Sequence, residues 1–208
     1  MSAVSESIVR EYFEQLGFFV RQQRKFIGQS RHDDDEIDFL AINPRYVPAA
    51  DPLPFVLASR DLAGVARAVV VVKGWHTDTF SPTLLANAPE IFRFVEPAAV
   101  QQAAKSFGGD GPLTKILVVP ALPTGADLRQ ASIELLQARG IDAVISFHTM
   151  LADLIEQIEV NRNYRKSDLL QIIRILKNYE FIREPQLELF KQGRARARRR
   201  ATGSSKGG

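Results

Sequence analysis

Hydrophobic and polar positions along the chain follow two periods, one typical of helices and one typical of strands. Residues 5–17 carry apolar side chains at helical spacing, with Ser5 as the expected N-cap and Gly17 as the C-terminal stop. Four consecutive valines within 66–75 predict a strand that is buried on both faces, and therefore central in a sheet.

The same alternation continues along the rest of the chain. Further strands are predicted at 18–26, 36–43, 115–122 and 141–147. Further helices are predicted at 126–140, 148–161 and 167–181, with a proline-broken helical stretch at 76–108 and a proline-rich loop at 45–54. This order predicts an α/β fold, a central mixed sheet flanked by helices, with a C-terminal helical extension.

We expect three parts in the chain. They are an α/β domain over 1–162, a helical extension over 163–190 and a disordered basic tail over 191–208. The tail holds seven basic residues and no acidic one, so the net charge of +3 leaves −4 for the rest of the chain. Basicity therefore predicts nucleic-acid binding for the tail and not for the body.

Composition adds limits on location. The chain has no cysteine, which excludes disulfides and cysteine-based zinc sites and fits a reducing compartment. No apolar run is long enough to cross a membrane, and the acidic N-terminal segment does not have the pattern of a signal peptide. We expect a cytoplasmic protein without a membrane partner.

Three candidate site residues occur in a suggestive order. Glu6 lies in the first helix, Asp38 lies in the strand segment EIDFLAI, and Lys73 ends the valine strand VVVVKGW. Carboxylates are the hard oxygen ligands that Mg²⁺ prefers, and a nearby lysine can stabilise the charge that develops on a phosphate. Asp38 interrupts an apolar strand, where a carboxylate needs a partner or a metal.

With these residues the chain resembles the PD-(D/E)XK nuclease superfamily, especially Holliday junction resolvases and restriction-endonuclease-like domains. ESIVREYFEQLGFFV is similar to the first helix and strand, EIDFLAI to the segment with the motif aspartate, and VVVVKGW to the strand that carries E-x-K. The resemblance implies a restriction-endonuclease-like fold and an endonuclease acting on DNA with Mg²⁺ or Mn²⁺. Asp38, Glu6 and Lys73 would be the catalytic residues.

Two positions depart from the family pattern. Ile37 replaces the proline before the aspartate, and Val71 replaces the glutamate of E-x-K. Since valine cannot ligate a metal through its side chain, either the ligand has migrated, with Glu36 or Glu6 compensating, or the site is inactive. The implied metal ligands are therefore Asp38, Glu6 and Glu36.

Each candidate also has a plain structural interpretation. Glu6 is then a first-turn acid favoured by the helix dipole, 33–36 is a solvated loop, and Lys73 marks a strand end. Trp75 is expected to be a packing residue and His76 a surface histidine. The tail arginines are either a nucleic-acid arm or a solubilising segment; they are Arg194, Arg196, Arg198, Arg199 and Arg200.

Three functions stay open on these grounds. The first is a metal-dependent nuclease that acts on DNA. The second is a degenerate nuclease-fold module that binds nucleic acid or a protein partner without cutting. The third is an unrelated α/β scaffold whose C-terminal helices serve oligomerisation, so a homodimer is also open. Val71 argues against the first, and the Asp38–Lys73 pair argues against the third.

Overall fold

The computed structural model describes residues 3–23, 37–48, 50–108 and 111–182. Within these residues the strands form one five-stranded sheet in the order β1-β2-β3-β4-β5. The strands are β1 (Phe19–Gln22), β2 (Phe39–Ile42), β3 (Arg67–Val72), β4 (Thr114–Val119) and β5 (Ala143–Ser146). The pairs β1–β2 and β2–β3 are antiparallel, whereas β3–β4 and β4–β5 are parallel. The predicted α/β class with a mixed sheet is confirmed, and the valine strand β3 is central.

The helices follow the predicted order. They are α1 (Ala3–Gln15), α2 (Pro82–Asn87), α3 (Pro97–Ser106), α4 (Ala126–Ala138), α5 (Phe147–Gln157) and α6 (Asp168–Asn178). Three short 3₁₀ helices complete the described elements: η2 (Ser59–Gly64), η3 (Pro89–Ile91) and η4 (Arg93–Val95). Between β3 and β4 a new helical piece begins at Pro82, Pro89 and Pro97, because proline fits the first turn of a helix and not its interior.

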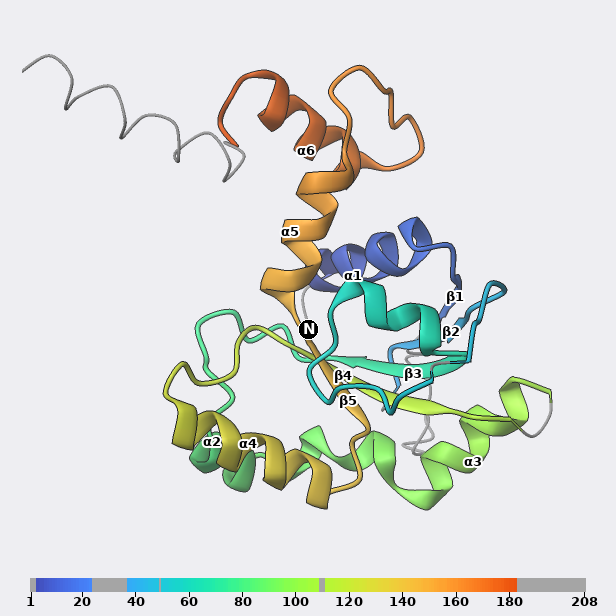
Figure 1. Cartoon of the computed structure of the whole chain (residues 1–208), viewed down its shortest axis with the longest axis vertical. Coiled ribbons are helices and arrows are strands. Elements are labelled where there is room, and N and C mark those ends of the chain that lie inside the picture. Colours follow the sequence, from blue (N-terminus) through green and yellow to red (C-terminus); the bar gives the residue numbers. More distant parts are fainter. Residues whose placement is uncertain (1–2, 24–36, 49, 109–110, 183–208) are drawn as a thin grey trace, which may run out of the picture. The chain divides into compact units, whose positions relative to one another are not determined.

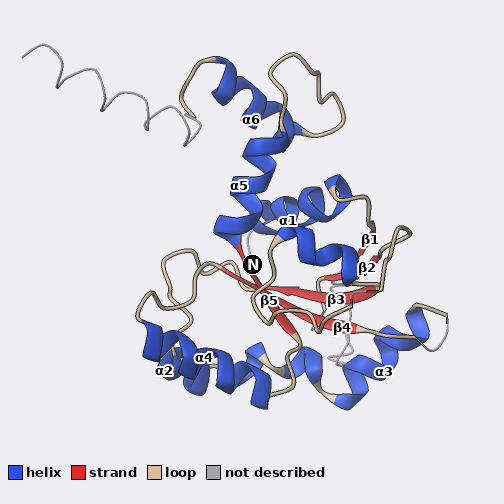
Figure 2. Ribbon diagram, in the orientation of Figure 1, coloured by secondary structure: helices blue, strands red, loops and turns tan. Residues whose placement is uncertain are grey.

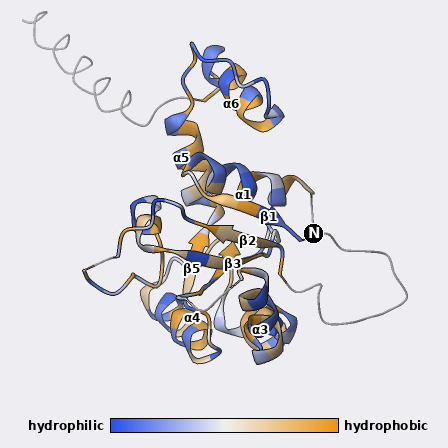
Figure 3. Cartoon of the chain, turned by 90° about the vertical axis from the view of Figure 1, so that its right-hand side faces the viewer, coloured by the Kyte–Doolittle hydropathy of each residue, from blue (hydrophilic) through white to orange (hydrophobic). Residues whose placement is uncertain are grey.

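The helices cover the two faces of the sheet unequally. Helix α1 lies on one face, and α2, α3 and α4 lie on the other (Figures 1 and 2). The view turned by 90° keeps α1 on one side of the strands and α3 and α4 on the opposite side (Figure 3). The central strands are therefore covered on both faces, which is why they read as continuous apolar runs.

The larger core lies between the sheet and the helices α2, α3 and α4. Val69 and Val71 of β3 belong to this core, together with Leu85 of α2 and Leu136 of α4. Because side chains alternate along a strand, Val70 points to the other face, which α1 covers. Burial of apolar area on both faces fixes β3 in the middle of the sheet.

Two helices end where glycine permits a left-handed turn. Gly17 has φ +88° and Gly140 has φ +90°, and both follow the last residues of their helices, α1 and α4. The Phe18 amide donates to the Phe13 carbonyl at 3.0 Å, which closes the end of α1 as a Schellman motif does. At the other end the prediction was wrong: α1 begins at Ala3, so Ser5 lies inside the helix and is not its N-cap.

The chain divides into two units between Ile155 and Glu156. In the second unit, Lys177 of α6 donates to the Ile158 carbonyl at 2.8 Å, and Ser167 caps α6 by accepting from the Leu170 amide at 3.2 Å. This division falls before the predicted boundary between 162 and 163. Among the described helices, none is long and apolar enough to cross a membrane.

Candidate functional site at the end of strand β3

Asp38 directly precedes β2 and is buried, with 3 % of its surface exposed. Its backbone amide donates to the Val70 carbonyl at 3.2 Å, and its carbonyl accepts from the Gln23 amide at 2.8 Å. Its carboxylate Oδ2 accepts a hydrogen bond from the Val72 amide at 2.7 Å. The side chain therefore takes the place of a strand carbonyl and extends the pairing between β2 and β3 by one bond.

The same geometry occurs a second time, at Asp142. This residue directly precedes β5, and its Oδ2 accepts from the Lys115 amide of β4 at 2.8 Å. Its Oδ1 also lies 3.2 Å from Lys115 Nζ. Asp142 is exposed, whereas Asp38 is buried, and the parallel strands place the two aspartates at opposite ends of the sheet. An aspartate in this backbone role is thus not by itself a sign of a functional site.

Lys73 follows Val72, the last residue of β3, and is half-buried. Its amide donates to the Val118 carbonyl of β4 at 2.9 Å, so the backbone of β3 continues in register past Val72. The amide that binds Asp38 belongs to the residue before Lys73. Two of the residues chosen from the sequence thus come from neighbouring strands to one end of the sheet. The predicted common face of their side chains stays a prediction.

Glu6 reaches the same corner from α1. Its Oε2 accepts a hydrogen bond of 2.6 Å from Nε2 of Gln22, the last residue of β1. Gln22 is the register partner of Phe39, the residue after Asp38. Gln22 could not be selected from the sequence, because its contact with Glu6 depends on how α1 packs against the sheet.

Val71 is packed in the core between the sheet and the helices α2, α3 and α4. It is 1 % exposed and belongs to the core cluster that contains Phe80 and Leu85. It pairs in register with Leu117 of β4, another member of the same cluster. At the position of the expected E-x-K glutamate, the chain therefore has an apolar side chain that is tightly packed among other apolar side chains.

A contact that the sequence did not predict joins α1 to the turn after β3. Ser5 Oγ lies 2.9 Å from His76 Nε2. His76 is exposed, as expected, but its imidazole is held in place. Trp75 packs against the core, with its ring centroid 5.6 Å from that of Phe80, which confirms the expected packing role. Ser5 and His76 are far apart in the chain, so nothing in the sequence pattern could have identified this pair.

The carboxylates of Asp38 and Glu6 are the kind of donor that Mg²⁺ and Mn²⁺ accept. Within the described ranges, no three His, Asp or Glu residues gather closely enough to hold a metal ion. The third predicted ligand, Glu36, lies outside the described residues, as do the other acids of 33–35 and the five tail arginines. The oxygen atoms of these two described carboxylates are suitable ligands for a divalent cation.

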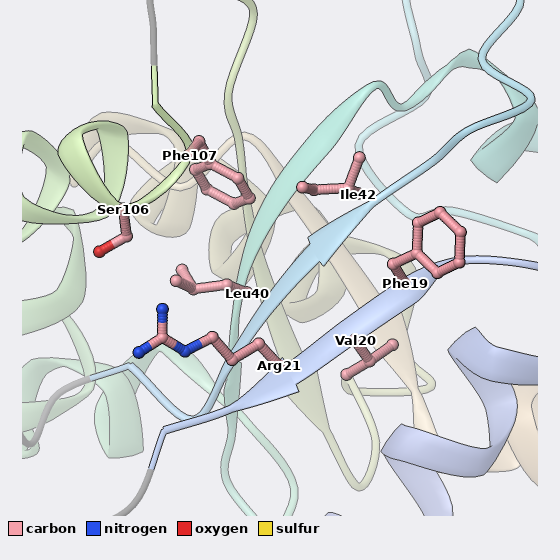
Figure 4. A pocket seen from close by; sticks show the side chains of 7 residues that line it. All are labelled: Phe19, Val20, Arg21, Leu40, Ile42, Ser106 and Phe107. Carbon is pink, nitrogen blue, oxygen red and sulfur yellow. The ribbon is translucent and has the colours of Figure 1, made fainter.

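One groove lies on the sheet face beside α3. Arg21 of β1 extends toward Ser106, and Phe107 lies over the strands (Figure 4). Phe19 of β1 is 69 % exposed and pairs with Ile42 of β2, which is also exposed. The groove is lined by Phe19, Val20, Arg21, Leu40, Ile42, Ser106 and Phe107. Five of its seven lining residues are aliphatic or aromatic, and Arg21 and Ser106 are polar, so the groove differs in character from the end of the sheet where Asp38 and Glu6 lie.

Fold and site together define an α/β protein with an open mixed sheet and a polar corner at the end of its central strand. Comparison with known proteins gives no matching family model, no matching curated protein and no matching solved structure.

Proposed function

We propose that the chain is a restriction-endonuclease-like domain that acts on DNA at the end of β3. The observation that carries the proposal is the Asp38 carboxylate, which is buried and bonded to the Val72 amide one residue before Lys73. The antiparallel pairing of β2 and β3 supports it, because it sets the start of one strand beside the end of the other. Glu6 reaches the same corner through Gln22.

The proposed roles follow from the chemistry of the side chains. The Lys73 ammonium would stabilise negative charge on a phosphate of the DNA backbone. Asp38 and Glu6 would hold a Mg²⁺ or Mn²⁺ ion, which supplies charge neutralisation at the phosphate and activation of a water molecule. The bond from the Val72 amide would fix the direction of the Asp38 carboxylate, so that little reorganisation is needed when the phosphate binds.

A second function is favoured by Val71. Because this side chain is packed among Phe80, Leu85 and Leu117, a third carboxylate at the E-x-K position is absent and has no room. In this alternative the domain is a degenerate nuclease that binds DNA or a protein partner without cutting it. The two functions share the fold and the phosphate contact of Lys73, and they differ in whether the phosphodiester bond breaks.

Cleavage and binding assays distinguish the two. Plasmid, branched and single-stranded DNA are incubated with the wild-type chain and Mg²⁺ or Mn²⁺, and binding of the same DNAs is measured in parallel. In the active case, products form more readily with Mn²⁺, because Mg²⁺ dehydrates reluctantly. Asp38→Asn, Glu6→Gln and Lys73→Met should then abolish cleavage.

Matched variants serve as controls. Asp142→Asn alters an aspartate with the same backbone role at the other end of the sheet. Lys105→Met is the control for Lys73→Met, because it removes an exposed lysine of α3. Both controls should keep wild-type activity. Binding without cleavage, weakened by Lys73→Met and not by Lys105→Met, would establish the degenerate function. The absence of both cleavage and DNA binding would overturn the proposal.

A further inference from the structure

His76 is an exposed side chain that is held from two directions. It lies in a turn closed by a 2.8 Å hydrogen bond from the Asp78 amide to the Trp75 carbonyl. Its Nε2 lies 2.9 Å from Ser5 Oγ, and its ring meets the Phe147 ring edge-on, with 4.7 Å between centroids. An exposed histidine normally samples several rotamers. These two contacts hold the His76 imidazole in one orientation.

The anchor depends on a glycine. Ser5 is fully buried against Gly74, and a Cβ at position 74 would lie 2.5 Å from Ser5 Oγ and 3.0 Å from Ser5 Cβ. A side chain at position 74 would therefore force the Ser5 hydroxyl out of its present position, and with it the contact to His76. Three separate positions, Ser5, Gly74 and His76, thus build one contact directly after Lys73.

Burial decides which member of the pair can meet a ligand. A serine that acts as a nucleophile must reach its substrate, and Ser5 has no exposed surface. Ser5 is therefore a positioning residue, and the exposed imidazole is the group that can touch a ligand. If the Ser5 hydroxyl donates to Nε2, the ring proton is on Nδ1, which then acts as a hydrogen-bond donor.

We propose that His76 is a further binding residue of the site, and that its Nδ1–H donates to a phosphate oxygen of the DNA backbone next to the one bound by Lys73. This inference rests on the proposed function. Phosphate oxygens are the main acceptors in protein–DNA contacts, and they take hydrogen bonds from neutral side chains as well as from cations. Lys73 and His76 are three residues apart at the end of one strand, and Glu6 follows Ser5 in α1.

Nuclear magnetic resonance on the full chain tests this assignment, because the sequence has only three histidines. Long-range ¹H–¹⁵N correlation spectra of ¹⁵N-labelled protein report the tautomer of each ring, and His76→Gln and His148→Gln assign the signals. In the free protein, His76 should be the Nδ1–H tautomer. On addition of a short DNA duplex, its ring signals should shift. The tautomer preference should be lost in Ser5→Ala.

Binding of the same duplex gives the second readout. His76→Gln should weaken binding about 5-fold, and Ser5→Ala should weaken it by a smaller factor in the same direction. His148→Gln is the matched control, since His148 is another exposed histidine, and it should bind as the wild type does. All three substitutions leave the buried strands unchanged, and thermal melting checks that each variant is folded.

The outcomes separate this inference from the function on which it rests. No binding of the duplex by the wild type overturns the proposed function and this inference together. Binding by the wild type, with unmoved His76 signals and equal affinity of His76→Gln, overturns this inference alone. If His76→Gln weakens binding and Ser5→Ala changes neither the tautomer nor the affinity, the positioning role of Ser5 is wrong.

Discussion

The carboxylate of Asp38 accepts a hydrogen bond from the backbone amide of Val72 at 2.7 Å, where β2 has not yet begun and β3 is about to end. This single bond gives Asp38 two separable roles. It satisfies a buried amide of the sheet, and it directs a buried carboxylate to the corner where Lys73 follows. Stability and activity therefore respond differently to different substitutions of this residue.

Asp38→Ala should lower the free energy of unfolding by about 1–3 kcal/mol, because it leaves the Val72 amide without its acceptor. Asp38→Asn keeps a carbonyl oxygen in the same place and should cost much less. Both variants should lose DNA cleavage, or metal-dependent DNA binding, if the carboxylate is functional. Urea unfolding followed by circular dichroism measures the first effect, and the DNA assays measure the second.

Asp142→Ala is the control for the backbone role alone. Its carboxylate also accepts from a strand amide, but it is exposed, so water can replace it and the loss of stability should be smaller. If Asp38→Asn keeps full activity, Asp38 has only the backbone role.

Val71→Glu should destabilise the fold by about 3 kcal/mol or more, because it buries a carboxylate among Phe80, Leu85 and Leu117. Val71→Ala, which only removes apolar volume, should cost about 2 kcal/mol. The comparison isolates the effect of the charge from that of the packing. A Val71→Glu chain that is as stable as Val71→Ala, and more active than the wild type, would show that a carboxylate at this position can reach the site.

Tyr12 is a buried tyrosine whose hydroxyl contacts Ser59 Oγ at 2.6 Å. The pKa of Tyr12 is raised from 10.0 to about 12, mainly by burial; the hydrogen bond to Ser59 lowers it, and the nearby Asp153 and Asp61 carboxylates raise it. The folded chain thus holds this proton more tightly than the unfolded chain. Its contribution is fully present below pH 10 and is lost as the pH rises to about 12, which amounts to about 3 kcal/mol.

Ultraviolet absorbance of tyrosinate checks this expectation. Tyr12 should ionise near pH 12, about two pH units above its ordinary value. Comparison of the wild type with Tyr12→Phe isolates this step, because the substitution removes one of the four tyrosines of the chain. If the absorbance that Tyr12→Phe removes appears near pH 10 and not near pH 12, the burial argument is wrong.

The basic tail should add affinity for nucleic acid. It carries seven positive charges within 191–208, and each phosphate that it neutralises releases counterions. A chain that ends at Phe190 should bind DNA more weakly and with a shallower dependence on salt. Replacing the five arginines between 194 and 200 by glutamine should have nearly the same effect, which distinguishes charge from length. Equal salt slopes for all three chains would remove the tail from DNA binding.

The sequence by itself determined most of the secondary structure. The four valines that end at Val72 predicted a central buried strand, because only a strand covered on both faces is apolar at every position. Gly17 predicted the end of α1, because glycine reaches positive φ without steric cost. Ser5 was wrongly placed as an N-cap, because serine stabilises a helix start but also lies inside helices when tertiary contacts use its hydroxyl.

The tertiary structure alone decided how the candidate residues relate to one another. Composition and order selected Glu6, Asp38 and Lys73, but they gave neither the Gln22 partner of Glu6 nor the Ser5–His76 contact. These contacts join residues far apart in the chain, and their geometry depends on how closely α1 packs against the sheet. Local propensity carries no information about the distance between α1 and the sheet, so these contacts could be found only from the tertiary structure.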